Sequence, residues 1–345
     1  MSVRIGILTA GGDCPGLNAV IRAVVRRALN DSGAVLGIRN GWRGLIDDDL
    51  ELLTRERVAG ILPRGGTILG TSRINPFDQP AYVARIGATW RRHGLDALVV
   101  VGGDGSLRTA RDMWRAHQTP LVGVPKTIDN DVGGTDFTFG FDTAVNIVTE
   151  AVDRLHSTAE SHHRVIVVEV MGRHTGWIAA YGGIAGGADV ILVPEHPFRV
   201  AHICELIEHR VAQGRPFSII VVSEYAHPRA EDNFINEAEA AEIYRTGQFG
   251  GIGNVLAREL ERRTGIQTRV TKLGYVQRGG TPSAFDRVLA TRFGVKAFEM
   301  VLAGEWGHMA ALQGSRMVSV PLDQALGQAK RLDEEVYRVA ETFFG

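Results

Sequence analysis

The sequence predicts an α/β protein of two doubly wound lobes, in which helices cover both faces of mainly parallel sheets. Short apolar runs that end at Gly, Asp or Pro alternate with helical patterns along most of the 345 residues. This alternation is typical of parallel strands joined by right-handed crossovers. The runs are continuously apolar, as expected of strands that are covered on both faces. Eight or more such strands in a chain of this length favour two lobes over one.

The spacing of apolar residues predicts the individual elements, because short apolar runs indicate buried strands and helical spacing indicates amphipathic helices. The expected strands are Val3–Thr9, Ala34–Ile38, Ala97–Val101, Leu121–Val124, Val165–Val170, Val190–Val193, Ser218–Val222 and Thr268–Leu273. The expected helices are Ala19–Leu29, Ala81–His93, Leu107–His117, Ala144–Ser157, Cys204–Gln213, Gly253–Arg263 and Ser283–Leu302. The more polar residues 226–252 are expected to form an exposed insertion with a short helix.

The composition is that of a soluble globular protein, with 44% hydrophobic residues and a formal net charge of -1. This balance gives no electrostatic reason to expect nucleic-acid or membrane binding. No apolar stretch approaches the roughly 20 residues that a membrane-spanning helix needs, and the N-terminus does not resemble a signal peptide. Cys14 and Cys204 lack metal-binding spacing, so we expect free thiols in a reducing cytoplasm.

Charged and glycine-rich turns follow several of the expected strands. In open parallel sheets, ligands bind beyond the carboxyl ends of the strands, so one crevice is expected to collect these turns. The turns are GGDCPG at 11–16, GGDGS at 102–106, PKTIDND at 125–131, MGRHTG at 171–176 and SEY at 223–225.

Two of these turns have the chemistry of a phosphate and metal site. The first opens a helix, where glycine lets the backbone approach a phosphate closely, although an ordinary tight turn has the same composition. In the second, Asp104 lies between glycines, and its carboxylate could bind Mg²⁺ beside the phosphates. The alternative for Asp104 is a plain helix N-cap.

The stretch TIDND at 127–131 concentrates charge after an apolar run. Thr127, Asp129 and Asp131 alternate, so they share one face if the segment is extended. One carboxylate there can accept a proton from an attacking hydroxyl, and a second can organise metal-bound water. Like charges so close together are unfavourable without a cation. An Asx-turn, which Asp-Asn-Asp also favours, is the structural alternative.

Arginines lie in or beside several of the turns. Guanidinium groups bind phosphate oxygens bidentately. Each arginine alone is more often a solvated surface charge, but several of them at strand ends and in glycine turns indicate phosphate binding. They are Arg64, Arg73, Arg164, Arg173, Arg269 and Arg278.

Together these turns resemble those of 6-phosphofructokinases. The motif GGDG alone is weak, because lipid and nicotinamide-dinucleotide kinases also carry it, whereas TIDND followed by MGR and then QRGG is highly specific. The order and spacing of the motifs match the family over about residues 3–305. The motifs are GGDCPGLNAVIR, RGGTILGTSR, GGDGS, PKTIDND, GFDTA, EVMGRHTGW, IAGGAD and LGYVQRGG.

The resemblance implies two Rossmann-like three-layer lobes that transfer a phosphoryl group from ATP to the 1-hydroxyl of fructose 6-phosphate, a step of glycolysis. Residues 1–140 with 277–330 would form the phosphoryl-donor lobe, 141–276 the sugar-phosphate lobe and 331–345 a C-terminal helix. The resemblance also implies a cytoplasmic enzyme that uses Mg²⁺ and forms a homo-oligomer, either a homotetramer or a dimer.

The resemblance implies roles for individual residues as well. Asp129 matches the general base, with Thr127 and Asp131 as its neighbours, and Arg73 and Arg173 would neutralise charge on the transferring phosphoryl group. Asp104 matches the aspartate that organises Mg²⁺. The residues that match the family's ATP site are Gly12, Arg73, Gly103, Asp104, Gly105 and Ser106. The residues that match the family's contacts to the sugar phosphate are Met171, Gly172, Arg173, Glu224, Tyr275 and Arg278. Arg164 and Arg269 match family residues that reach the active site of a neighbouring subunit.

Two positions bear on the phosphoryl donor. In the family, pyrophosphate users generally carry Asp after the metal aspartate and Lys before Thr-Ile-Asp. Gly105 stands at the first position, as in ATP users, and Lys126 at the second, as in pyrophosphate users. A carboxylate at 105 would crowd and repel an α-phosphate, whereas glycine leaves room, so ATP is the expected donor. The mixed pattern resembles the actinobacterial-type group of the family.

Three alternatives remain open. The donor could be pyrophosphate, or the acceptor could be another sugar phosphate, such as sedoheptulose 7-phosphate. The third alternative is a non-catalytic sugar-phosphate sensor. Such a sensor is expected to have lost the base or the metal carboxylate, and Asp104 and Asp129 are both present.

Overall fold

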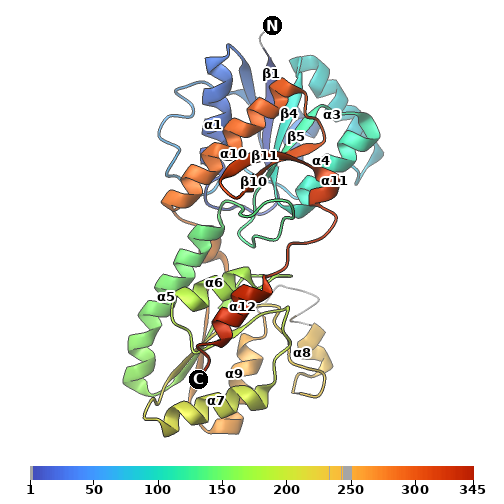
Figure 1. Cartoon of the computed structure of the whole chain (residues 1–345). Coiled ribbons are helices and arrows are strands. Elements are labelled where there is room, and N and C mark those ends of the chain that lie inside the picture. Colours follow the sequence, from blue (N-terminus) through green and yellow to red (C-terminus); the bar gives the residue numbers. More distant parts are fainter. Residues whose placement is uncertain (1–2, 233, 242, 244–250) are drawn as a thin grey trace. The chain divides into compact units, whose positions relative to one another are not determined.

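The computed structural model describes residues 3–232, 234–241, 243 and 251–345 (Figure 1). The chain divides into two compact units, Met1–Thr143 with Arg278–Ala329 and Ala144–Gln277 with Lys330–Gly345. Cys14 and Cys204 are free and buried. Within the described ranges, no helix has the length and apolar character needed to cross a membrane.

The first unit is built on a mixed sheet. Its strands are β1 (Arg4–Ala10), β2 (Ala34–Ile38), β3 (Leu50–Leu52), β4 (Ala97–Gly102), β5 (Leu121–Pro125), β10 (His308–Gln313) and β11 (Arg316–Pro321). Their order is β11-β10-β5-β4-β1-β2-β3. The central strands run parallel, as predicted, and antiparallel pairs occur at the edges, between β2 and β3 and between β10 and β11.

Helices cover both faces of this sheet. They are α1 (Leu17–Asn30), α2 (Trp42–Asp47), α3 (Pro80–His93), α4 (Asp104–His117), α10 (Ala284–Ala303) and α11 (Leu322–Ala325). Alternate strand residues point to opposite faces. One set, which includes Leu8, Ile38 and Val100, packs with residues of α2, α3 and α4 in one buried cluster. Helix α1 packs along α10 (Figure 1). Right-handed crossovers from β1 to β2 and from β4 to β5 advance in opposite directions, which places α1 and α4 on opposite faces.

The second unit contains a parallel sheet in the order β7-β8-β6-β9, formed by β6 (Val165–Val170), β7 (Val190–Leu192), β8 (Ser218–Ser223) and β9 (Thr268–Lys272). Its helices are α5 (Phe141–His162), which begins in the first unit, α6 (Trp177–Ala185), α7 (Val200–Ala212), α8 (Glu237–Ala241), α9 (Gly253–Thr264), α12 (Glu334–Glu341) and the 3₁₀ helix η2 (Gly274–Arg278). Helices α7 and α9 share a buried cluster with β6, β7 and β8.

The structure contains every strand and helix expected from apolar spacing, with ends that differ by a few residues. The spacing missed the two edge strands β3 and β11 and the strand β10 that pairs with β11. It also missed the helices α2, α6 and α11, and α12 (Glu334–Glu341) was implied only by the resemblance. Two glycines weaken the helical pattern of α6, and Gly182 is needed there because a Cβ would lie 2.5 Å from Val148 of α5. Helix α8 is the short helix expected within 226–252, of which residues 233, 242 and 244–250 lie outside the described residues.

A buried ion pair ties α7 to the edge of the second sheet. Arg210 Nη2 lies 2.9 Å from Asp189 Oδ1, and both residues are buried. Asp189 Oδ2 also accepts from the Ile219 N–H at 2.8 Å, and Arg210 Nε donates to Ser218 Oγ at 3.2 Å. Burial raises the pKa of Asp189, although Arg210 acts in the opposite direction. Removing either charge alone would therefore leave the other one buried without a partner.

Arg210→Ala should lower the free energy of unfolding by about 3 kcal/mol, because it leaves a buried carboxylate without its cation. Urea unfolding at neutral pH measures the change. Arg154→Ala is the matched control, since it removes an exposed arginine that pairs with Glu150 on the surface of α5, and it should leave the midpoint almost unchanged. Equal effects of the two variants would contradict the assignment.

Candidate functional site

Three of the turns predicted from the sequence lie at neighbouring carboxyl ends of the first sheet. Residues 11–16 follow β1, residues 103–106 follow β4 and residues 126–131 follow β5. These strands are adjacent in the order β5-β4-β1. The chain passes from β1 to β2 on one side, while β4 and β5 lie on the other, so a topological switch point falls between β1 and β4. Ligands of open parallel sheets bind at such a point.

The first turn presents its backbone at this point. Gly11 has φ 84° and Gly16 has φ 105°, a conformation that favours glycine. Helix α1 begins directly after Gly16, and no side chain of the described residues caps its N-terminus. The first N–H groups of α1 and their partial positive charge therefore suit an anion.

The loop that carries Arg73 is bonded to the first turn. The Gly11 N–H donates to the Ser72 carbonyl at 3.1 Å, and Thr71 Oγ1 donates to the Gly11 carbonyl at 2.6 Å. Arg73 follows directly and is exposed. Arg73, a predicted ATP-site residue, therefore directly follows two residues that are hydrogen-bonded to the first turn.

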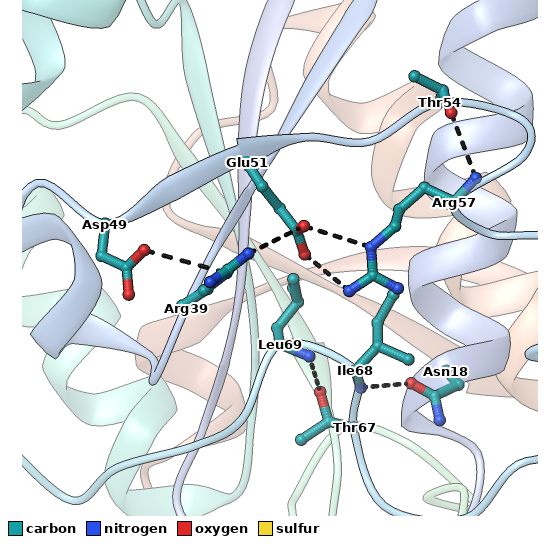
Figure 2. A network of polar contacts seen from close by, with 9 residues as sticks. All are labelled: Asn18, Arg39, Asp49, Glu51, Thr54, Arg57, Thr67, Ile68 and Leu69. Atoms are coloured by element: carbon teal, nitrogen blue, oxygen red, sulfur yellow. Dashed lines mark hydrogen bonds and ion pairs between the residues drawn. The ribbon is translucent and has the colours of Figure 1, made fainter.

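Polar contacts farther along hold this loop and the neighbouring strand in place (Figure 2). Asn18 of α1 accepts from the Ile68 N–H at 2.8 Å. Glu51 of β3 accepts from Arg39 at 3.2 Å and from Arg57 at 3.0 Å. Burial acts to raise the pKa of Glu51, but these two guanidinium groups outweigh it and lower the pKa. The Asn18 bond thus supports the loop, whereas the Glu51 pairs support β3 and leave each of their charges already paired.

The second turn leaves open space beside Asp104. Asp104 is the first residue of α4, and its Oδ2 accepts from Arg108 Nε at 2.8 Å. A Cβ built on Gly105 would meet nothing within 4 Å, so packing does not require glycine at this position. A Cβ built on Gly11 would lie 3.1 Å from Ser106 Oγ, which shows how closely the first and second turns approach each other.

Lys126 connects all three turns. Its N–H donates to the Gly102 carbonyl at 2.9 Å, and its amino group donates to the Gly12 carbonyl. The amino group also lies 4.0 Å from the position that a Cβ of Gly103 would take. The residue is only 4% exposed, and burial lowers its pKa. A buried amino group needs a hydrogen-bond partner, and the Gly12 carbonyl supplies one.

The carboxylates of the third turn lie in a desolvated setting. Burial raises the pKa of Asp129, although Arg278 and Lys126 act to lower it. Burial and then the charge of Asp129 raise the pKa of Asp131 to about 6. Asp131 Oδ1 is buried and has no hydrogen-bond partner within the described part of the chain. Perturbed carboxylates of this kind are characteristic of sites that bind a cation or transfer a proton.

The third turn is not extended at Asn130, so the condition under which Thr127, Asp129 and Asp131 would share one face is not met, although Thr127 and the charge of Asp129 both act on the pKa of Asp131. Asn130 adopts a left-handed conformation with φ 51°, and its Oδ1 accepts from the Thr138 N–H at 3.0 Å. Thr127 Oγ1 accepts from the Asp129 N–H at 3.0 Å. The turn chemistry that the sequence offered as an alternative is therefore present together with the perturbed carboxylates.

Arg278 reaches this cluster from a distant part of the sequence. Its Nη1 donates to the Asp13 carbonyl at 3.4 Å and lies 2.8 Å from the position that a Cβ of Gly12 would take. Its charge also acts on the pKa of Asp129 and Lys126. The first unit thus brings together Gly12, Gly103–Ser106, Lys126–Asp131 and Arg278.

In the second unit, another predicted set lies at the carboxyl ends of β6 and β8. Met171, Gly172 and Arg173 follow β6, and Glu224 follows β8. Ser223 Oγ donates to the Gly172 carbonyl at 2.6 Å, which joins the two strand ends. Gly172 has φ 136°, and a Cβ there would lie 2.8 Å from Ser223 Oγ, so glycine is required at this turn.

Gln277 is a buried residue of this region that the sequence patterns did not single out. Its Oε1 accepts from the Met171 N–H at 3.2 Å, and its Nε2 donates to the Gly274 carbonyl at 3.0 Å. It therefore fixes the sugar-phosphate candidate Met171 to the segment that carries Tyr275, whose side chain is 80% exposed. The signal that could have identified it is its place within LGYVQRGG, beside Arg278.

Arg164 and Arg269 lie at the opposite ends of these strands. Arg164 directly precedes β6, and Arg269 is the second residue of β9, where Val165 pairs with Thr268. Arg164 Nε donates to the Gln267 side chain at 2.5 Å. Because the strands are parallel, their amino ends lie away from their carboxyl ends, and the structure separates these two arginines from Met171–Arg173.

A sequence model of the family described as "Phosphofructokinase" matches residues 4–301. The chain belongs to the phosphofructokinase family. This confirms the resemblance drawn from the motifs, and the two α/β units with mainly parallel sheets confirm the fold class that it implied.

Individual members of the phosphofructokinase family resemble this chain over its whole length. It is 51% identical over 345 residues to the pyrophosphate–fructose 6-phosphate 1-phosphotransferase of Streptomyces coelicolor, which covers 99% of this chain and 100% of that protein. It is 49% identical over 348 residues to the ATP-dependent 6-phosphofructokinase of Corynebacterium efficiens, covering 100% and 99%. The pyrophosphate-dependent phosphofructokinase of Marinobacter aquaeolei superposes with a TM-score of 0.84 at 25% identity, covering 99% of this chain and 88% of that one.

Asp131→Asn should stabilise the free protein at pH 8 by at most about 3 kcal/mol, since the pKa of Asp131, about 6, lies about two units above its ordinary value and one unit corresponds to about 1.4 kcal/mol. The pKa of Asp131 is raised in the folded state, so the carboxylate destabilises the fold increasingly as pH rises from about 4 to 6. Urea unfolding at pH 4.5 and pH 8, with a chelator present, measures the effect. The advantage of the variant should shrink at the lower pH, and an advantage that is equal at both pH values would count against this assignment.

Proposed function

We propose that this phosphofructokinase-family protein transfers the γ-phosphoryl group of ATP to the 1-hydroxyl of fructose 6-phosphate, giving fructose 1,6-bisphosphate and ADP. The observation that carries the proposal is the half-buried, perturbed pair Asp129 and Asp131 beside Arg278 at the switch point of the first sheet. Phosphoryl transfer depends on positioning, cationic groups and a base for the acceptor hydroxyl, more than on covalent chemistry. In this site Asp129 is the general base.

The donor binds to the first unit in this proposal. The uncapped N-terminus of α1 and the turns at Gly12 and Gly103–Ser106 receive its phosphates, and Arg73 neutralises charge on the transferring group. The N–H groups of these turns are fixed by the backbone, so their dipoles need little reorganisation during the reaction. Thr127 holds Asp129 through the bond to its N–H.

The residues present fit a magnesium ion. Within the described residues no cluster of three His, Cys, Asp or Glu side chains is preformed as a metal site. Mg²⁺ usually takes one or two carboxylates together with substrate phosphates and water, so such a cluster is not required. The charges of Asp129 and Asp104 both raise the pKa of Asp131, which a cation would relieve. Asp104 would hold the ion, and the ion would supply positive charge to the phosphates.

The sugar phosphate binds residues of the second unit in this proposal, together with Arg278. Met171, Gly172, Arg173, Glu224 and Tyr275 are its contacts. Arg164 and Arg269 do not belong to this set in their own chain, since they lie at the amino ends of the strands. Their position supports a homo-oligomer in which they serve a neighbouring subunit. The tetrameric state and the cytoplasmic location remain predictions.

A pyrophosphate donor is the second candidate, because relatives of similar identity carry both names. The open space at Gly105 supports ATP, since a Cβ there would meet nothing within 4 Å and glycine leaves still more room beside the donor phosphates. Lys126 does not oppose ATP, because its amino group is engaged by the Gly12 carbonyl inside the protein. Another sugar phosphate as acceptor remains an alternative.

Phosphorylation of fructose 6-phosphate by the purified protein, with Mg²⁺ and either ATP or pyrophosphate, tests the donor. We expect turnover with ATP, and we expect Gly105→Asp to lower kcat/KM for ATP by about a hundredfold, because it places a carboxylate beside the donor phosphates. Lys126→Met should weaken both donors alike, because it releases the first turn. Turnover with pyrophosphate alone would overturn the choice of ATP, and no turnover with either donor would overturn the proposed function.

Asp129→Ser should lower kcat at least about a hundredfold, which is the lower range for loss of a general base. Steady-state kinetics with fructose 6-phosphate measure kcat, and calorimetry with an ATP analogue and Mg²⁺ measures donor affinity. Donor affinity should change little, because position 129 lies outside the turns at Gly12 and Gly103–Ser106 that receive the donor phosphates. Turnover near that of the wild type would show that Asp129 is not the base.

A further inference from the structure

The turn that carries Arg173 is held at both of its ends within the second unit. Gly172 and Gly176 are buried, whereas Arg173, which lies between them, is exposed. The first end is fixed by the Ser223 hydroxyl, which donates to the Gly172 carbonyl at 2.6 Å. The position of the exposed arginine therefore depends on what fixes the other end, at Gly176.

Glu195 fixes this other end. Its Oε1 and Oε2 accept from the Gly176 N–H at 3.1 Å and 3.0 Å. Glu195 follows β7, and the parallel order β7-β8-β6 brings the carboxyl ends of β6 and β7 to one edge of the sheet. The contact is close, since a Cβ built on Gly176 would lie 2.4 Å from Val193. Helix α6 begins directly after Gly176, so the carboxylate also lies at a helix N-terminus, which favours negative charge.

The same carboxylate holds the C-terminal segment, residues 330–345, which belongs to the second unit. Glu195 Oε1 also accepts from the Leu332 N–H at 3.0 Å. A second bond lies beside the first, because Trp177 Nε1 donates to the Lys330 carbonyl at 3.1 Å. The Lys330 amino group lies 4.8 Å from the centroid of the Trp177 ring. A carboxylate has only acceptor atoms, so one side chain can serve two backbone segments at once.

The side chain of Arg173 has a weaker contact of its own. Its guanidinium carbon lies 5.7 Å from the centroid of the Tyr225 ring, a distance at which a cation is attracted to the face of an aromatic ring. Such an attraction is small for an exposed pair and does not fix the backbone. The two ends of the turn therefore decide where the guanidinium group lies.

We infer that Glu195 is a positioning residue for the sugar-phosphate site, which fixes the second end of the turn 171–176 and ties that end to the C-terminal segment. Glu195 touches no reacting atom. The kinetic consequence rests on the proposed function, in which Met171, Gly172 and Arg173 contact the sugar phosphate. The turns that receive the donor phosphates belong to the first unit, so the effect should be confined to the acceptor.

The experiment uses the full chain with graded variants. Glu195→Ala removes both acceptor oxygens, and Glu195→Gln retains one of them. Asp232→Ala is the matched control, because the Asp232 carboxylate accepts from the Val200 N–H at 3.2 Å, at the start of α7 in the same unit. Hydrogen exchange, followed by mass spectrometry on peptides that cover residues 171–178 and 330–335, reports how firmly the two segments are held. Steady-state kinetics with Mg²⁺ report the effect on each substrate.

In Glu195→Ala both peptides should exchange several-fold faster than in the wild type, because each loses the acceptor of a backbone N–H. The same variant should lower kcat/KM for fructose 6-phosphate by about tenfold, in line with the sensitivity of reactions to small misplacements of the reacting groups. The KM for ATP should stay within about twofold, whereas a general loss of structure would affect both substrates. Glu195→Gln should lie between the wild type and Glu195→Ala, and Asp232→Ala should match the wild type in both measurements.

Wild-type exchange or wild-type kcat/KM for fructose 6-phosphate in Glu195→Ala would overturn the inference, and so would an equal loss toward both substrates. If Glu195→Ala does not fold, Glu195→Gln decides the matter. Its amide nitrogen would replace one of the two oxygens that the Gly176 N–H contacts, so unchanged exchange at 171–178 would overturn the inference. Absence of turnover in the wild type would refute the proposed function alone, and the exchange measurement, which needs no activity, would still decide whether Glu195 fixes the turn.

Discussion

The bond from the Lys126 amino group to the Gly12 carbonyl is the constraint on which the arrangement of the site depends. A buried amino group cannot be left without an acceptor, and a glycine turn cannot keep one shape without a fixed partner. Lys126 satisfies both requirements, and its N–H also bonds Gly102. The parallel sheet brings the turns after β1, β4 and β5 into the same region. Lys126, through its amino group and its backbone N–H, then sets their spacing.

The close approach of the three turns is unfavourable for the carboxylates of the third turn. Asp129 and Asp131 are desolvated and repel each other, and Arg278 only partly compensates. A fold selected for stability alone would replace Asp131 with a neutral residue, which could keep the turn that Asn130 makes. Strain of this kind is expected where a cation and a proton are to be handled, and it is absent from the Glu51 network, where two arginines satisfy one carboxylate.

The sequence predicted the strands and turns well, because a short, continuously apolar run followed by glycine or aspartate is typical of a strand covered on both faces. Parallel strand order then brings Asp104 and Asp129 to one edge without further information. The rest depended on tertiary contacts. Arg278 lies 265 residues from Asp13, whose carbonyl it contacts, and no local pattern signals that approach. The sequence left open whether TIDND is extended or forms a turn, and only the contact of the Asn130 side chain with Thr138, eight residues on, shows the left-handed turn.

Lys126 suggests a phosphoryl donor when it is read in the sequence, but its contacts in the structure say little about the donor. Lys126 matches pyrophosphate users, but its amino group is engaged within the protein, and the first turn needs it whichever donor binds. Position 105 differs, because a side chain there would enter open space and would not disturb the fold. A substitution at 105 therefore carries no cost in packing, which makes it the sharper test of the proposed donor. Relatives that are about equally similar to this chain carry the names of different donors, so overall similarity does not identify the donor.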